Sequence, residues 1–312
     1  MEYGDKHILV LGAGASGIGA SWVLAQVGAH VVLNDYKPVT LPADEEKRLV
    51  SAGVDIITGR QDESLLDGVD CIVISPGISL DIPIVKAAQE RGIDVVSEVE
   101  VAYELSKSPI VAVTGTNGKT TTTTLLTKVL EGTGKPVRVG GNIGDSLSEV
   151  AYSMPADGFL VAELSSYQLE TIKHFRPIGA IMLNITPDHL ARHKTMENYI
   201  AAKERIFENQ LSTDFMVLNI DDPIVADMEH RVPSHILKIS QHQVVPNGAY
   251  YDKGQCYVTK DGKATPVIGS DDIHIPGSHN IENILTVIAL TYALGVPVET
   301  IHRIISEFHG VE

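Results

Sequence analysis

Residues 111–124 read VAVTGTNGKTTTTT, a short apolar run that breaks into a glycine-rich turn and ends in Gly-Lys-Thr-Thr. The run predicts a strand, and the turn predicts a loop in which Gly115 and Gly118 let backbone N–H groups approach an anion closely. Lys119 adds a mobile positive charge, and Thr120 adds a hydroxyl suited to the shell of a Mg²⁺ ion. The stretch therefore predicts that a nucleotide's phosphates bind between a strand and the positive N-terminus of the following helix.

The loop departs from the generic P-loop pattern at one position. Val113 stands where that pattern has its first glycine, so the motif is the rarer and more specific form Gly-Thr-Asn-Gly-Lys-Thr-Thr. A threonine-rich turn without a ligand is the alternative interpretation. The helix predicted after the loop has an apolar face and ends at glycines, namely Leu125, Leu126, Val129, Leu130, Gly132 and Gly134.

The composition favours a two-domain cytoplasmic protein. A chain of 312 residues with 44% hydrophobic residues is long enough for two cores. The formal net charge of −16 argues against nucleic acid as a partner. Cys71 and Cys256 are too few for a disulfide framework or a metal knuckle. Because the N-terminus runs straight into an apolar strand and no apolar run reaches the ~20 residues of a membrane span, we expect neither a signal peptide nor membrane insertion.

Strand and helix patterns alternate along most of the chain. Residues 7–105 show the rhythm of βαβ units, and the alternation restarts at residue 110 after a Ser-Lys-Ser-Pro boundary. Residues 241–276 are rich in glycine, proline and β-formers and predict an antiparallel hairpin region. We therefore expect an α/β protein with a Rossmann-like domain at 1–106. A P-loop ATPase-type domain at 107–312 is expected to have a mainly parallel sheet and a small antiparallel subsheet.

A second glycine-rich turn lies near the N-terminus. Residues 12–17 read GAGASG, the Gly-x-Gly-x-x-Gly fingerprint, and Asp35 follows the next strand at the spacing expected for a ribose contact. Taken alone, the fingerprint indicates a nicotinamide or flavin enzyme, but it reports only a phosphate-sized anion near a helix start. Ser75-Pro76-Gly77 ends another apolar strand, where either a ligand contact or a plain tight turn is expected.

Two titratable residues follow strands predicted in the second half of the chain. Glu163 follows residues 159–162, and a carboxylate there is the usual partner of Mg²⁺ or of an attacking water beside a P-loop. His189 follows residues 180–183, so we expect it at the same edge of the sheet with a ligand or catalytic role. A surface acid and a capping histidine are the alternatives. His193 is interpreted as structural.

Lys203 is unusual because of its neighbours on a predicted helix. The helix is expected over 196–209, with Thr195 as its N-cap. By helical spacing Lys203 lies in the middle of the apolar stripe formed by Tyr199, Ile200, Ile206 and Phe207. A lysine there must extend to solvent, pair, or be chemically altered, and extension to solvent is the default interpretation. A desolvated lysine amine is the form that reacts.

Six segments, occurring in this order over the whole chain, resemble the Mur ligases, ATP-dependent enzymes that add amino acids to the bacterial cell-wall precursor. They are GTNGKTT at 115–121, GGNIG at 140–144, AELSSYQLE at 162–170, NITPDHLARH at 184–193, AAKERIF at 201–207 and HNIENIL at 279–285. The N-terminal segments GAGASGIGA, NDYK and SPGI most resemble the members that add D-glutamate. The L-alanine-adding relative usually has histidine where Asn117 stands.

The resemblance implies an ATP site and two Mg²⁺ sites. The residues implied for ATP are Gly115, Thr116, Asn117, Gly118, Lys119, Thr120, Thr121, Asn280 and Asn283. Thr120 with Glu163 is implied for one Mg²⁺. His189 with Lys203 is implied for the other, and there the family's lysine is carbamylated by CO₂. A carbamate supplies the oxygen ligands that Mg²⁺ prefers, which an amine cannot. The implied catalytic residues are Lys119, Glu163, His189 and Lys203.

The same resemblance assigns the N-terminal turns to a uridine diphosphate rather than to a nicotinamide cofactor. The residues implied for this substrate are Gly14, Ala15, Ser16, Gly17, Asp35, Tyr36, Lys37, Ser75, Pro76, Gly77 and Asn142. The implied substrates are UDP-N-acetylmuramoyl-L-alanine, D-glutamate and ATP. ATP would phosphorylate the L-alanyl carboxylate to an acyl phosphate, and the amine of D-glutamate would displace phosphate from it. We expect a monomer without nucleic-acid or membrane partners.

Family members carry a third, C-terminal domain, and the sequence ends at Glu312 where the linker to it would begin. The expectation from this ending is a chain that binds the uridine nucleotide but does not ligate. Another amino-acid-adding Mur ligase is the nearest alternative. A nicotinamide-dependent oxidoreductase would leave Glu163 and Lys203 unexplained, and a GTPase switch would need an Asn-Lys-x-Asp signature that the sequence lacks.

Overall fold

The computed structural model describes residues 3–311, which form two compact units. The first unit contains the chain up to Lys107 together with residues 144–153 and 167–175. The second unit contains residues 108–143, residues 154–166 and the chain from Arg176 onward. Two short segments that lie in the sequence between strands of the second unit therefore belong to the first.

Five parallel strands form the sheet of the first unit, in the order β3-β2-β1-β4-β5. They are β1 (His7–Leu11), β2 (His30–Asp35), β3 (Asp55–Thr58), β4 (Cys71–Ile74) and β5 (Asp94–Ser97). Side chains alternate along β1, so Ile8 and Val10 are buried on one face and Leu9 and Leu11 on the other. From β1 the chain first adds β2 and β3 on one side of the sheet and then returns to add β4 and β5 on the other. The turns after β1 and β4 therefore meet at the switch point of the strand order.

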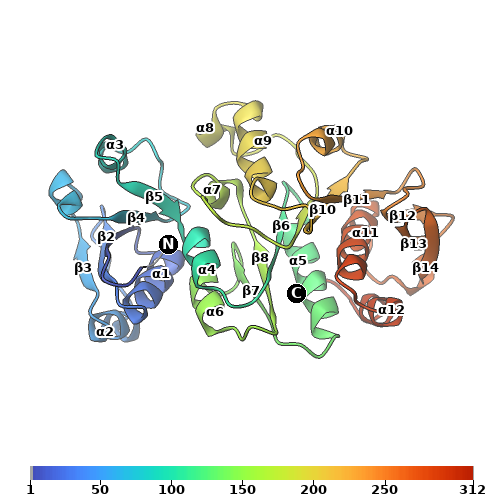
Figure 1. Cartoon of the computed structure of the whole chain (residues 1–312), viewed down its shortest axis with the longest axis horizontal. Helices are drawn as coiled ribbons and strands as arrows, with labels where there is room; N and C mark the ends of the chain where they lie inside the picture. The colour runs from blue at the N-terminus through green and yellow to red at the C-terminus, as the bar shows by residue number, and fades with distance from the viewer. Residues whose placement is uncertain (1–2, 312) are drawn as a thin grey trace. The chain divides into compact units, whose positions relative to one another are not determined.

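Helices cover both faces of this sheet. On the face of Val10, the apolar residues Ala20 and Leu24 of α1 join the core, and on the opposite face Ile84 and Val85 of α3 do so. The helices of this unit are α1 (Ala15–Gln26), α2 (Ala43–Ser51), α3 (Pro83–Glu90), α4 (Glu98–Leu105), α6 (Leu147–Ser153) and α7 (Ser166–Leu169), the last beginning one residue before the unit's third segment. Their labels appear in Figure 1.

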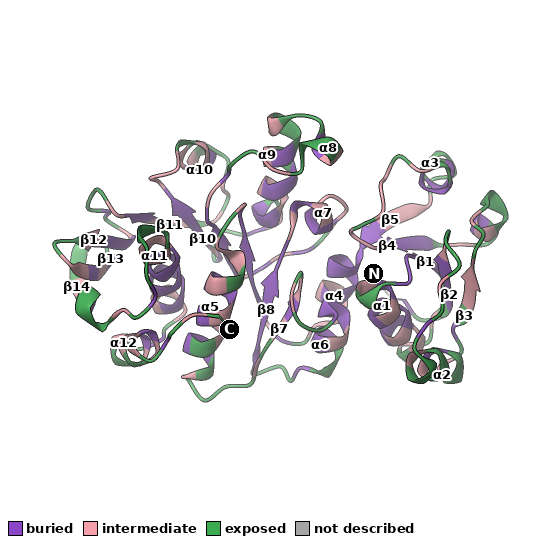
Figure 2. Ribbon diagram, turned by 180° about the vertical axis from the view of Figure 1, so that it is seen from behind, coloured by how far each residue is buried: buried purple, intermediate pink, exposed green. Residues whose placement is uncertain are grey.

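Nine strands form the sheet of the second unit, in the order β14-β13-β12-β11-β10-β9-β6-β8-β7. Its parallel strands are β6 (Ile110–Thr114), β7 (Val137–Gly141), β8 (Phe159–Glu163), β9 (Gly179–Met182), β10 (Phe215–Asn219), β11 (His235–Ser240) and β12 (Gly248–Asp252). Two antiparallel strands extend it, β13 (Gln255–Lys260) and β14 (Lys263–Gly269). Figure 2 shows β8 and β10 coloured as buried, as expected of strands inside a mainly parallel sheet.

Three helices bury the core of this second sheet. They are α5 (Lys119–Glu131), α11 (Ser278–Ala293) and α12 (Val298–Ser306). The predicted apolar face of α5 is buried at all four positions, Leu125, Leu126, Val129 and Leu130. The shorter helices of the unit are α8 (Leu190–His193), α9 (Met196–Glu204) and α10 (Pro223–Asp227).

The predicted fold class is confirmed, including the small antiparallel part of the second sheet. The helix predicted over 196–209 is wrong at its end, because α9 stops at Glu204 and continues as a 3₁₀ turn, Arg205–Phe207. There Glu208 N–H donates to the carbonyl of Arg205 at 3.2 Å, the tighter bond that commonly ends a helix. Within residues 3–311, none of the helices has both the length and the apolar character needed to cross a bilayer.

Candidate functional site

The glycine-rich loop joins the carboxyl end of β6 to the first residue of α5, and its glycines are sterically required. Gly115 and Gly118 have φ of 146° and 86°, in the region that favours glycine. A Cβ on Gly115 would lie 2.8 Å from Cβ of Leu183, and one on Gly118 would lie 2.6 Å from Oδ1 of Asn283. The sequence therefore folds here into a bare-backbone loop at a helix N-terminus, a form suited to phosphate.

Lys119 folds back onto its own loop. Its Nζ donates to the carbonyls of Gly115 at 3.0 Å and Thr116 at 2.8 Å. Partial burial lowers the pKa of its amine, while the carboxylates of Glu163 and Asp188 oppose that shift. The ammonium thus lies beside the loop, held by neutral carbonyls that an anion can replace. The following Thr120 is exposed and Thr121 is half-buried at the start of α5.

Asn184, two residues after the end of the neighbouring strand β9, fixes the shape of the loop. Its carbonyl accepts from Thr116 N–H at 2.8 Å, its Oδ1 accepts from Asn117 N–H at 2.8 Å, and its Nδ2 donates to the carbonyl of Asn117 at 3.0 Å. The hydroxyls of Thr116 and Tyr199 are hydrogen bonded at 3.0 Å. Sequence reasoning missed these roles of Asn184 and Tyr199, although both lie in or beside the segments that resemble the family.

Glu163 is the last residue of β8 and is 1% exposed. Its Oε1 accepts from Nδ2 of Asn142 at 2.9 Å, and the N–H of Asn142 donates to its carbonyl at 2.8 Å. Its Oε2 is buried and accepts no hydrogen bond within the described part of the chain. A buried carboxylate oxygen without a donor is costly, and a hard cation is the partner that removes this cost. The residues therefore fit Mg²⁺.

Lys203 is buried, and the interpretation that its amine extends to solvent is wrong. The side chain is 2% exposed because α9 packs this residue against the loop. Its Nζ donates to the carbonyl of Gly115 at 2.8 Å and to Oγ1 of Thr114 at 3.3 Å, and lies 5.0 Å from the centre of the Tyr199 ring. Burial, with the ammonium of Lys119 second, lowers the pKa of Lys203 to about 7.

The two histidines of the 184–193 segment have different surroundings. His189 has φ of 53° at the N-cap of α8, its side chain is 45% exposed, and its Nε2 lies 3.3 Å from a carboxylate oxygen of Asp188. Its ring contacts the ring of Tyr199 edge-on at 6.4 Å, so His189 and Lys203 share one aromatic neighbour. His193 is 6% exposed with Nε2 2.8 Å from Oγ of Ser166, in agreement with its structural interpretation.

Two asparagines in the first turns of α11 lie next to the loop. Nδ2 of Asn283 donates to Oδ1 of Asn280 at 3.2 Å, and Nδ2 of Asn280 donates to the carbonyl of Pro276 at 2.7 Å. Asn283 also lies beside Gly118 of the loop. The loop, Lys119, Glu163, Lys203 and these asparagines thus gather at one edge of the second sheet.

The candidate substrate residues of the first unit gather at its switch point. Gly12 has φ of 101°, and the hydroxyl of Ser75 donates to its carbonyl at 3.3 Å. A Cβ on Gly17 would lie 1.8 Å from the Gly12 carbonyl, whereas one on Gly14 would meet nothing within 4 Å. The backbone at Gly14, together with its neighbours Ala15 and Ser16, is therefore the open part of the turn.

The carboxylate of Asp35 is hydrogen bonded to the glycine-rich turn at residues 12–17. Its Oδ2 accepts from the N–H of Ala13 at 2.9 Å, and its Oδ1 accepts from the N–H of Lys37 at 3.0 Å. Tyr36 is 70% exposed beside it. The carboxylate thereby links the glycine-rich turn at residues 12–17 to the residues after β2. The Ser75-Pro76-Gly77 turn follows β4, the strand that pairs with β1.

Comparison with known proteins places both parts of the sequence in one group. Residues 113–291 match the Mur ligase middle domain, and residues 6–97 match the Mur ligase MurD-like N-terminal domain. The chain is 43% identical over 312 residues to the UDP-N-acetylmuramoylalanine--D-glutamate ligase of Thermoanaerobacter sp. strain X514, covering 100% of this chain and 69% of the relative. It is 42% identical over 311 residues to the enzyme of the same name from Halalkalibacterium halodurans, covering 100% of this chain and 68% of the relative.

Solved structures show the same fold at lower identity. The UDP-N-acetylmuramate:L-alanyl-gamma-D-glutamyl-meso-diaminopimelate ligase of Neisseria meningitides has a TM-score of 0.67 and 22% identity, with 98% of this chain and 99% of that chain covered. The UDP-N-acetylmuramate-alanine ligase of Thermotoga maritima has a TM-score of 0.57 and 23% identity, with 98% of this chain and 69% of that chain covered.

Proposed function

Because the chain belongs to the Mur ligase family, we propose that it is an ATP-dependent ligase that joins D-glutamate to UDP-N-acetylmuramoyl-L-alanine in peptidoglycan precursor synthesis. The observation that carries the proposal is the whole-chain sequence identity of 40–43% to ligases of that name, over both units. The relatives are ligases, and this disfavours the nicotinamide-dependent oxidoreductase suggested by residues 12–17 alone. We assign residues 1–106 to the UDP substrate and residues 107–312 to ATP.

The reaction proceeds in two steps, formation of an acyl phosphate and then of an amide bond. The L-alanyl carboxylate oxygen attacks the γ-phosphorus of ATP, the bond to the β,γ-bridging oxygen breaks, and ADP leaves with that electron pair. The amine of D-glutamate then attacks the acyl carbon, and the tetrahedral intermediate expels inorganic phosphate as the amine loses a proton. Catalysis of the first step is chiefly positioning and electrostatic stabilisation.

The glycine-rich loop and Lys119 hold the triphosphate in this proposal. The amides at the start of α5 point toward the anion, and the ammonium of Lys119 exchanges the carbonyls of Gly115 and Thr116 for phosphate oxygens. Asn184 keeps the loop in this shape through its three hydrogen bonds. Asn280 and Asn283, beside Gly118, are assigned to the adenine, and Asn142 to the substrate and its phosphate.

Thr120 and Glu163 are the residues that hold a Mg²⁺ ion in this proposal, supported by the unsatisfied Oε2 of Glu163. A bound Mg²⁺ neutralises charge on the transferring phosphoryl group. His189 and Lys203 are assigned to a second Mg²⁺, with Lys203 as a carbamate. The neutral amine of Lys203 attacks the carbon of CO₂, the N–C bond forms, and one proton is released. Burial of Lys203 among neutral partners supports this assignment, since it favours the uncharged amine.

A direct assay tests the function. The purified protein is mixed with ATP, Mg²⁺ and UDP-N-acetylmuramoyl-L-alanine, and then with D-glutamate, L-glutamate or L-alanine. Ligation gives ADP and a product heavier by one glutamyl residue only with D-glutamate, detected by mass spectrometry, whereas the sequence expectation of a chain that binds the uridine nucleotide without ligating predicts no such product. UDP-N-acetylmuramate with L-alanine is the control for the neighbouring reaction of the family. A product formed with another amino acid in preference to D-glutamate contradicts the proposal.

A further inference from the structure

A cavity of about 870 Å³ lies in the second unit, away from the glycine-rich loop. It opens where β10, β11 and β12 begin and where α11 ends, whereas the loop follows the carboxyl end of β6. These strands are parallel, so the cavity and the loop lie at opposite edges of the sheet. A five-residue strand such as β10 separates the edges by about 17 Å. The cavity is therefore distinct from the candidate ATP site.

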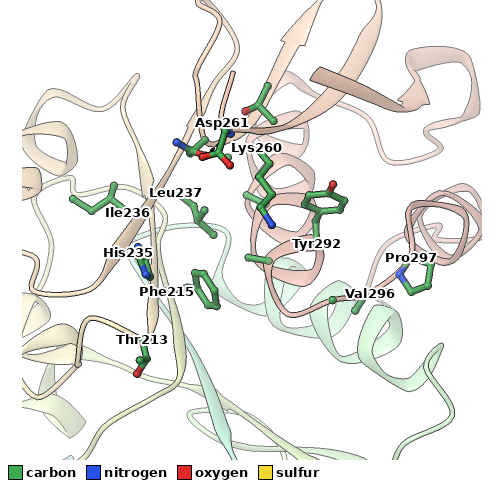
Figure 3. Close-up of a pocket in the computed structure, with 16 residues that line it drawn as sticks. Thr213, Phe215, His235, Ile236, Leu237, Lys260, Asp261, Tyr292, Val296 and Pro297 are labelled. Atoms are coloured by element: carbon green, nitrogen blue, oxygen red, sulfur yellow. Dashed lines mark hydrogen bonds between the residues drawn. The ribbon is translucent and has the colours of Figure 1, made fainter. Parts of the chain in front are cut away.

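The walls of the cavity are largely apolar. Figure 3 shows Phe215 and Leu237 on one side, with Tyr292, Val296 and Pro297 facing them across the space. The His235 ring lies against Phe215, with ring centres 5.9 Å apart. A volume of this size, lined mostly by aromatic, aliphatic and small residues together with six polar or charged ones, is typical of small-molecule sites.

One cation points into this apolar space. Figure 3 shows the Lys260 side chain reaching between Leu237 and Tyr292. No carboxylate among residues 3–311 forms an ion pair with Lys260. The adjacent Asp261, at the hairpin turn, also lines the cavity, and its N–H donates to Oδ1 of Asn247 at 2.8 Å. The cavity thus combines largely apolar walls with one ammonium among its lining residues, that of Lys260, at an exposed rim that also carries Asp261.

We propose that this cavity is a binding site for a small amphipathic monoanion, one acidic group joined to an aromatic or aliphatic body. The acidic group lies on Lys260, and the body fills the space between Phe215 and Tyr292. Charge complementarity at the rim gives the orientation, and burial of apolar surface gives most of the affinity. The site goes beyond the ligase reaction and does not depend on it, so either proposal can fail without the other.

Two fluorescent probes that differ in one charge test the site. The probes are 8-anilinonaphthalene-1-sulfonate, an aromatic monoanion, and N-phenyl-1-naphthylamine, its uncharged counterpart. We expect saturable binding of both to the folded protein, with decanoate displacing the sulfonate and ATP with Mg²⁺ displacing neither. Displacement of the sulfonate by ATP with Mg²⁺ overturns the proposal, because the probe then occupies the nucleotide site.

Three variants locate the probes. Lys260→Met keeps the apolar stem and removes the charge. It should therefore lower the affinity for the sulfonate about three- to fivefold and leave the affinity for the neutral probe unchanged. Lys263→Met is the matched control, since Lys263 pairs with Lys260 across the β13–β14 hairpin but does not line the cavity. Ala293→Trp fills the space at the end of α11 and should abolish binding of both probes.

Two results with these variants would overturn parts of the proposal. Equal sulfonate affinity in Lys260→Met and wild type overturns the role of the charge. If the Ala293→Trp protein is folded by circular dichroism and still binds the neutral probe with wild-type affinity, the probe does not bind in this cavity. Because Lys260 is exposed on a hairpin, its substitution tests the proposal even if the tryptophan variant does not fold.

Discussion

At the scale of single residues, Lys119 shows how the protein holds a charge ready for a ligand. Its ammonium bonds only to the neutral carbonyls of Gly115 and Thr116 within the described chain, so an incoming phosphate meets a cation that no carboxylate neutralises by contact. Such a cation stabilises the transition state most where negative charge develops during phosphoryl transfer.

Replacing Lys119 by alanine should therefore impair phosphoryl transfer more than folding. We expect acyl-phosphate formation to fall by about 10²- to 10³-fold, equivalent to roughly 3–4 kcal/mol. The measurement is ADP formation in the presence of UDP-N-acetylmuramoyl-L-alanine. Lys128→Ala, at an exposed position of the same helix, is the control and should be near wild type. Near-normal acyl-phosphate formation by Lys119→Ala would refute the assignment.

Lys203 permits a test of covalent modification. In Lys203→Ala the proposed carbamate is lost, and we expect activity to fall below detection. A short carboxylic acid such as acetate should restore part of it, because its oxygens occupy the place of the carbamate oxygens. Lys203→Arg should stay inactive with or without acetate, since a guanidinium keeps its charge and its bulk. An active arginine variant would show that only a cation is needed there.

At the scale of elements, the loop between β6 and α5 depends on glycine for two separable reasons. Gly118 combines φ of 86° with a Cβ position 2.6 Å from Oδ1 of Asn283. Gly134, after α5, has φ of 79° but nothing within 4 Å of the corresponding position. Substituting alanine at Gly134 therefore tests backbone strain alone, whereas alanine at Gly118 adds displacement of Asn283.

We expect Gly118→Ala and Gly134→Ala to lose similar stability, about 1–2 kcal/mol each, because alanine is strained at positive φ. Only Gly118→Ala should also weaken ATP binding, by about tenfold or more, since its Cβ pushes Asn283 away from the loop. Urea denaturation and calorimetric titration with ATP and Mg²⁺ measure the two effects. Equal ATP affinity in both variants would remove Asn283 and the loop from the nucleotide site.

A buried acid, Glu98 of α4, is hydrogen bonded to the start of helix α6 within the first unit. Glu98 is 2% exposed, and its Oε1 accepts from Oγ of Ser146 at 2.5 Å and from N–H and Oγ of Ser148 at 2.8 and 2.9 Å. Its Oε2 has no partner within the described chain. Burial raises the pKa of Glu98 despite these hydrogen bonds.

This raised pKa gives a pH dependence with a definite sign. Above about pH 4.3 the unfolded chain loses the Glu98 proton before the folded chain does, so wild-type stability falls with rising pH until the folded pKa is passed. Relative to Glu98→Gln, the wild type should lose up to ~1.4 kcal/mol per pH unit over this window. Urea denaturation from pH 4.5 upward measures the difference, with Glu90→Gln on the exposed surface of α3 as control. A wild-type free energy of unfolding that rises with pH relative to that of Glu98→Gln would contradict the argument.

At the scale of the whole molecule, local signals in the sequence account for the sheets and long-range packing accounts for what was missed. Apolar runs and glycine turns lie within a few residues of one another, so the parallel strands, the loop at Gly115–Gly118 and the cap at Thr195 could be predicted. The burial of Lys203 depends on α9 packing against a loop about 90 residues earlier in the sequence, which periodicity alone does not reveal. The bonds of Asn184 and the association of residues 144–153 with the first unit are of the same kind.

The net charge of −16 is a property of the whole chain, and it opposes the arrival of every anionic substrate. Salt screens this repulsion, because the Debye length falls from about 20 Å near 0.02 M to about 8 Å at 0.15 M. We therefore expect kcat/KM for UDP-N-acetylmuramoyl-L-alanine to rise about two- to threefold over this range of KCl at constant free Mg²⁺. The double variant Glu46→Lys and Glu90→Lys, with both positions exposed, makes the chain less negative by four charges and should flatten the salt dependence. A rate that falls with added salt in the wild type would show that local cations such as Lys119 govern the encounter instead.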